Sequence, residues 1–170
     1  MTIKIFGAIL VILGCSAFGF YVAANRRREE NTLRKLVAAL DYMECELQYR
    51  LSSLPDLCRS TASQCNGLIQ TLFKELAVEL EAQVSPNVKF CMEAALDKVQ
   101  HLPKHSMECC KMLGSAIGRF DMNGQMKGLE AVRAECRRRL DLMSSNSEKL
   151  TRSYQTLGIC AGAALVILLM

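Results

Sequence analysis

Residues 3–24 read IKIFGAILVILGCSAFGFYVAA, and this apolar run, whose only charged residue is Lys4, organises the rest of the chain. As an α-helix its roughly 22 residues would span about 33 Å, enough to cross a hydrocarbon core of about 30 Å. The run is too long for a cleaved signal peptide, and the sequence NRRREE at residues 25–30 closes it abruptly. Small residues at Ala23 and Ala24 leave cleavage as the alternative. We expect an uncleaved transmembrane anchor over residues 1–24.

The charges on either side of this anchor predict its orientation. A single lysine, Lys4, lies near its start, whereas Arg26, Arg27 and Arg28 follow its end. Short flanks rich in lysine and arginine stay on the cytoplasmic side of a membrane. The middle of the chain is therefore expected in the cytosol, with the N-terminus on the other side.

The middle of the chain carries nearly all of its charge. All 17 acidic residues and 20 of the 21 basic ones lie between Arg26 and Arg152, within a chain of 170 residues. The resulting small positive excess is too mild to favour nucleic acid as a partner. A segment of this size can bury one core, so we expect a single cytosolic domain over residues 25–153.

The nine cysteines fit a reducing compartment. Cys15 and Cys160 lie in the apolar ends, and the other seven are spread over amphipathic patterns without any CxxC pair. In the cytosol such cysteines are expected to be small buried hydrophobic residues, not partners in disulfides.

The middle domain is expected to be helical throughout, because its apolar residues recur at spacings of three and four and never alternate over a useful length. Each of its prolines stands where a helix can begin, and Ser85 is expected to cap the helix that starts with Pro86. A loop is expected at Asp121-Met122-Asn123-Gly124. About six helices are expected, over residues 31–51, 53–65, 68–83, 86–99, 103–118 and 125–153.

Five of the six expected helices, all but that over residues 53–65, have a named apolar stripe that would face a shared core. The stripes consist of Leu33, Leu36, Val37, Leu40, Met43, Leu47 and Leu51; Leu68, Leu72, Phe73, Leu76 and Leu80; Val88, Cys91, Met92, Ala95, Leu96 and Val99; Met107, Cys110, Leu113 and Ile117; and Leu129, Val132, Cys136, Leu140 and Met143. The expected fold is all-α, a cytosolic bundle of about six helices between an N-terminal transmembrane helix and a short C-terminal apolar helix.

The C-terminal segment, residues 154–170, contains no charged residue. Its roughly 17 residues are the lower limit for a transmembrane helix, which we expect here, and an interfacial or bundle-buried tail is the alternative. Gly158 and Gly162 have the GxxxG spacing that lets membrane helices approach closely, and Gly14 and Gly19 in the anchor could supply the facing surface.

One cluster, His101, His105, Cys109 and Cys110, contains the residue types that bind zinc. Pro103 argues against a metal site, because it is expected to begin a helix and to leave His101 in the preceding loop. Motifs for nucleotide binding or metalloprotease chemistry are absent from the sequence. We therefore expect no enzyme activity, no cofactor, no metal and no small-molecule substrate.

The densest charge in the domain is Arg137-Arg138-Arg139. Consecutive residues on a helix point about 100° apart, so the three cannot all face one partner. A solvated face is the simplest interpretation, and contact with anionic lipid or an acidic protein is the alternative. These arginines, with Asp121 and Gln125 in the expected loop, are the candidate partner-binding residues.

Several segments, in their order along the chain, carry a family resemblance. They are the anchor, LRKLVAAL at 33–40, ECELQY at 44–49, SLP at 53–55, Leu113-Gly114, Asp121, Gly124-Gln125, and LGICAGAALVILL at 157–169. Together they resemble the stage III sporulation protein AB family of endospore-forming Firmicutes, over essentially the whole chain. That family is related to the inner-membrane platform proteins of type II secretion and type IV pili, whose cytosolic domains are six-helix bundles.

The resemblance implies a component of the channel that links mother cell and forespore, located in the mother-cell-derived membrane around the forespore. Its cytosolic bundle would contact a secretion-type ATPase, stage III sporulation protein AA, and pass motor motion to other channel components in the membrane. A self-associating membrane scaffold or holin-like protein without an ATPase partner is the alternative.

Overall fold

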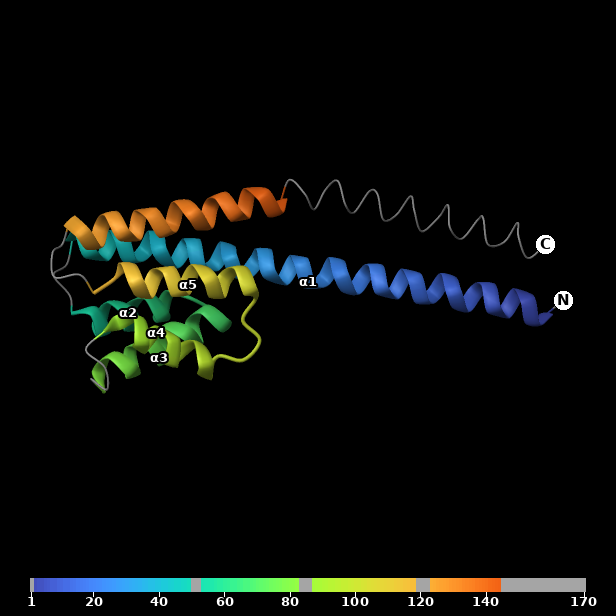
Figure 1. Ribbon diagram of the computed structural model, residues 1–170, viewed down its shortest axis with the longest axis horizontal. Coiled ribbons are helices and arrows are strands. Elements are labelled where there is room, and N and C mark those ends of the chain that lie inside the picture. Colours follow the sequence, from blue (N-terminus) through green and yellow to red (C-terminus); the bar gives the residue numbers. More distant parts are fainter. Residues whose placement is uncertain (1, 50–52, 83–86, 119–122, 145–170) are drawn as a thin grey trace. The chain divides into compact units, whose positions relative to one another are not determined.

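The computed structural model describes residues 2–49, 53–82, 87–118 and 123–144, and in residues 2–20 and 23 it describes the backbone only (Figure 1). The chain divides into two compact units, one made of Met1–Arg28 with Leu142–Met170 and the other of Glu29–Asp141. The second unit contains the helical bundle.

Six helices make up the described residues, which confirms the all-α expectation for this part of the chain. They are α1 (Thr2–Tyr49), α2 (Leu54–Gln64), α3 (Leu68–Glu81), α4 (Val88–Lys98), α5 (Lys104–Ala116) and a last helix over residues 123–144, drawn in orange in Figure 1. From α2 to α5 each helix packs against the next along the chain.

The first helix differs from the expectation, because α1 continues through the charged residues 25–30 instead of beginning anew at Asn31. Arginine and glutamate are good helix formers, and neither glycine nor proline interrupts them here. Arg34 also pairs with Glu30 at 2.7 Å, four residues apart on the same face. Local propensity therefore favours one continuous helix across this boundary.

The apolar stripe of α1 is confirmed as part of the core. Leu33, Leu36, Leu40 and Met43 are fully buried and Leu47 nearly so, whereas Val37 is half-buried at the edge of the stripe. Leu51 lies outside the described residues.

The stripe of α3 is confirmed at its centre, where Leu72, Phe73 and Leu76 are fully buried, and is wrong at its two ends. Leu68 and Leu80 are only half-buried, and the core residues are Ile69, Leu72, Phe73, Leu76 and Ala77. Because α3 packs against both α2 and α4, its buried face is wider than a single row of leucines. The centre of that buried face also lies to one side of the leucine row. Val88, Met107, Leu140 and Met143 are half-buried for a related reason, since each lies at the edge of its helix's buried face.

The starts of α2 and α4 both have side-chain N-caps. At α2 the helix begins where expected, and Ser53 is its N-cap, with its Oγ accepting from Asp56 N and Pro55 in the first turn. At α4, the expected cap Ser85 is wrong, because Asn87 is the N-cap and its Oδ1 accepts from Lys89 N at 3.0 Å. Asparagine caps a helix as well as serine does, so sequence preference did not separate the two positions. Ser85 and Pro86 lie outside the described residues.

The last described helix begins earlier than expected, because Asn123 and Gly124, placed in a loop by the sequence, are helical. Both residues disfavour helix interiors, but the amides of a first turn have no intrahelical partner, which makes this position tolerant. The fifth helix follows the expectation, with Pro103 directly before α5 and Gly118 beyond its end at φ +90°, where glycine is favoured.

In the part of the chain that the structure describes, no helix is both long enough and apolar enough to cross a membrane. The side chains of residues 2–20 and all of residues 145–170 lie outside that part. The N-terminal anchor at 1–24, the C-terminal span at 154–170 and the packing of Gly14 and Gly19 with Gly158 and Gly162 therefore stay predictions.

Candidate functional site

Arginines of the 123–144 helix connect it to α1. Arg133 Nη1 donates to Asp41 Oδ1 at 3.1 Å and also bonds the carboxylate of Glu44. One turn further along, Arg137 Nη2 donates to both Asp41 carboxylate oxygens at 3.1 Å. The Glu44 side chain is 19% exposed and the Arg133 side chain is 23% exposed, which makes them the two least exposed members of this group. The two helices, far apart in sequence, are thus joined by charge-assisted hydrogen bonds.

The same helix is connected to α5 through Arg139. Its Nε donates to Glu135 Oε1 at 2.8 Å, and its Nη1 bonds the Glu108 carboxylate on α5. Arg138 also donates twice to Glu135, at 2.8 Å. Hydrogen bonds from Arg138 and Arg139 hold the pKa of Glu135 at about 2. Arg139 likewise holds the pKa of Glu108 below its usual range.

The predicted partner-binding cluster, Arg137 to Arg139, is therefore satisfied by carboxylates of its own chain. The side chains of Arg137 and Arg138 are still 54% and 62% exposed, whereas that of Arg139 is 20% exposed. Gln125 is half-buried in the first turn of the same helix, and Asp121 lies outside the described residues. These ion pairs therefore attach the last described helix to the rest of the bundle.

The His101 to Cys110 cluster is divided by the fold. His101 lies in the turn before α5 with φ 66°, and His105 is exposed on the helix. Cys109 and Cys110 are fully buried. Among the described residues, no three His, Cys, Asp or Glu side chains gather as metal ligands would.

The cysteines of the described residues are free thiols, and all but Cys45 are buried. Burial raises the pKa of Cys58 to about 12 and raises the pKa of Cys110 as well. A thiol whose pKa is raised is protonated at neutral pH and is a poor nucleophile. Six of the seven cysteines in the described residues are buried, as the sequence predicted, and the prediction is wrong for Cys45, which is exposed.

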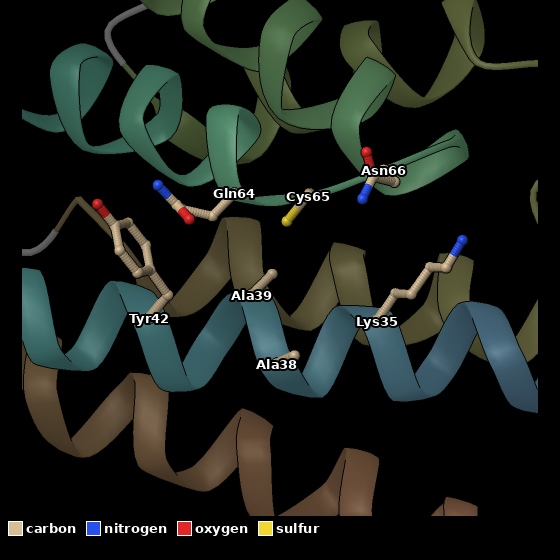
Figure 2. Close-up of a pocket in the computed structure, with 7 residues that line it drawn as sticks. All are labelled: Lys35, Ala38, Ala39, Tyr42, Gln64, Cys65 and Asn66. Atoms are coloured by element: carbon tan, nitrogen blue, oxygen red, sulfur yellow. The ribbon is translucent and has the colours of Figure 1, made fainter.

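A hollow of about 120 Å³ that the sequence did not reveal lies between α1 and the segment joining α2 to α3 (Figure 2). It is lined by Lys35, Ala38, Ala39 and Tyr42 on one side and by Gln64, Cys65 and Asn66 on the other. The α1 residues fall on one helical face by their spacing, which is a signal present in the sequence. The second wall could not be predicted, because it depends on how α2 and α3 pack.

The described fold defines an all-α helical-bundle protein. A family model described as Stage III sporulation protein AB matches residues 4–170, and the chain belongs to this family, whose members are sporulation proteins. A relative from Bacillus subtilis (strain 168), Stage III sporulation protein AB, is 29% identical over 178 residues, covering 99% of both chains.

A solved structure of a Stage III sporulation protein AB is also similar in fold. It matches with a TM-score of 0.63 and 22% identity, covering 71% of this chain and 97% of the other. The resemblance stated from the sequence segments is thereby confirmed at the level of the family.

Proposed function

We propose that this chain is a non-enzymatic membrane platform that couples a cytosolic secretion-type ATPase to the other components of the mother cell–forespore channel. The observation that carries the proposal is membership of the stage III sporulation protein AB family over residues 4–170. The coupling role is inferred from the relation of that family to the platform proteins of secretion systems.

The bundle has the connections that such a role requires. A platform that passes motion on must move as a body, and the ion pairs of Arg133, Arg137 and Arg139 join the last described helix to α1 and α5. Partly buried, hydrogen-bonded pairs resist separation better than single exposed pairs.

The membrane side of the bundle can be tested with a native thiol. Cys45 is exposed, whereas the other cysteines of the described residues are buried. With Cys15 and Cys160 replaced by alanine, and with the chain produced in non-sporulating cells so that it lies in the plasma membrane, a membrane-impermeant maleimide should label Cys45 only after cell lysis. Cys45→Ser supplies the matched control. Labelling in intact cells would place the bundle outside the cytosol and would exclude any contact with a cytosolic ATPase.

The partner itself is tested by binding. The full chain in detergent micelles or nanodiscs should bind the purified ATPase, stage III sporulation protein AA. A chain that ignores the ATPase but forms a defined oligomer would support the alternative, a self-associating membrane scaffold or holin-like protein.

A further inference from the structure

The hollow beside Lys35 is a surface feature of the described residues, and none of the residues lining it takes part in the ion pairs of the 123–144 helix. Figure 2 shows Lys35 and Asn66 at one end, Tyr42 and Gln64 at the other, and Cys65 between them above Ala39. Ala38 is exposed and Ala39 is buried, so the floor is apolar and open to approach from outside. The volume of about 120 Å³ equals roughly four water molecules, enough for one side chain.

Lys35 makes the hollow cationic. No carboxylate lines the hollow, and Lys35 has no ion pair with any residue that the structure describes. Its ammonium lies close to the turn between α2 and α3, because a Cβ added to Gly67 would stand 3.7 Å from Lys35 Nζ. Arg137, Arg138 and Arg139 differ in this respect, since each already has a carboxylate partner.

The two ends of the hollow differ in charge. At the far end the Tyr42 hydroxyl donates to Glu46 at 3.2 Å, which places a carboxylate next to that end. A second acid would be repelled there and attracted by Lys35 at the opposite end. The side-chain amides of Gln64 and Asn66, which have no hydrogen-bond partner among the described residues, supply N–H donors at both ends.

We propose that this hollow receives an acidic side chain, aspartate or glutamate, from a partner protein, with the carboxylate bound by Lys35 and Asn66. The rest of the inserted side chain lies over Ala38 and Ala39. The inference rests on the proposed function, because it takes the ATPase as the partner, and it names the surface that the arginine cluster was expected to provide.

The test compares matched variants of the full chain in nanodiscs, with binding of the purified ATPase measured by biolayer interferometry. Lys35→Glu should weaken binding by about tenfold or more, because reversal replaces an attraction by a repulsion in a partly enclosed site. Ala38→Leu, which fills the hollow without changing charge, should weaken it similarly. Lys74→Glu on α3 is the control, since Lys74 is also exposed and without an ion pair among the described residues, and it should change binding by less than about twofold.

A charge swap identifies the contact directly. If the proposal holds, one Asp or Glu to Lys substitution on the ATPase restores binding to the Lys35→Glu chain. Equal binding by wild type, Lys35→Glu and Ala38→Leu would overturn the hollow as the docking site and leave the platform proposal standing. Absence of binding by the wild-type chain would remove both. A change in oligomeric state without a change in ATPase binding would assign the hollow to a second copy of this chain and overturn the proposed partner.

Discussion

Gly114 on α5 lies close against α4, and the contact predicts the sign of a substitution at this position. A Cβ built on Gly114 would lie 2.6 Å from Met92 Cβ and 3.0 Å from Met92 Cγ, with Lys89 Cα at 3.5 Å. The nearest atom is fixed to the α4 backbone and cannot rotate away. An alanine at this position therefore requires α4 and α5 to separate.

The magnitude follows from two opposing effects. Replacing glycine by alanine within a helix stabilises it by about 0.5–1 kcal/mol. Inserting a carbon into a packed contact costs about 1–3 kcal/mol, and the short distance to a rigid atom favours the upper half of that range. We expect Gly114→Ala to lower the free energy of unfolding by about 1–2 kcal/mol, and Gly114→Val to lower it further.

The assay is urea unfolding of the full chain in detergent micelles, followed by far-ultraviolet circular dichroism. Ser115→Ala, at the neighbouring exposed position of α5, is the control and should stay within about 0.5 kcal/mol of wild type. A Gly114→Ala chain as stable as wild type, or more stable, would mean that the gain in helix propensity outweighs the steric cost of the added carbon. The close packing of α4 against α5 would then be refuted.

Substitutions at three further positions test other parts of the bundle. Ser106 is fully buried and its Oγ has no hydrogen-bond partner among the described residues, so Ser106→Ala should raise the free energy of unfolding by about 1 kcal/mol in the same urea assay. Arg133→Ala removes a bond to the half-buried Glu44 and should lower that free energy by about 1–2 kcal/mol, with Arg133→Lys recovering part of the loss. The pKa of Glu135 is lowered from 4.5 to about 2, so its ion pairs stabilise the fold above pH 4.5 and are lost as the pH falls towards 2. Urea midpoints measured between these pH values should therefore fall less steeply for Glu135→Gln than for wild type, and parallel slopes would contradict the assignment.

The sequence predicted the helical character of the described chain and most of its core, because burial of one face leaves a spacing of three and four in the residues themselves. It failed at α3, where the leucine row suggested Leu68 and Leu80 but the core contains Ile69 and Ala77. A row of leucines shows which face is most apolar. The width and centre of the buried face depend on two neighbouring helices that the row does not encode.

The candidate site was predicted less well than the fold. Arg137 to Arg139 stood out in the sequence because charge density is visible there, yet their partners Asp41 and Glu108 lie far away along the chain. The lysine that lines the hollow, Lys35, looked like an ordinary residue of a helix's solvated side. Exposure and pairing of a charged side chain are properties of its surroundings in space, so residue type alone did not separate these cases.

By itself, then, the sequence determined the all-α class, the places where helices begin near Ser53 and Pro103, and the family. Those features depend on local backbone preference and on the periodicity of single segments. Only the tertiary structure decided that Asp41 on α1 pairs with arginines of the 123–144 helix, and that Lys35 faces the segment joining α2 to α3. These contacts depend on the rotation and register of one helix against another, which side-chain packing sets across the whole bundle.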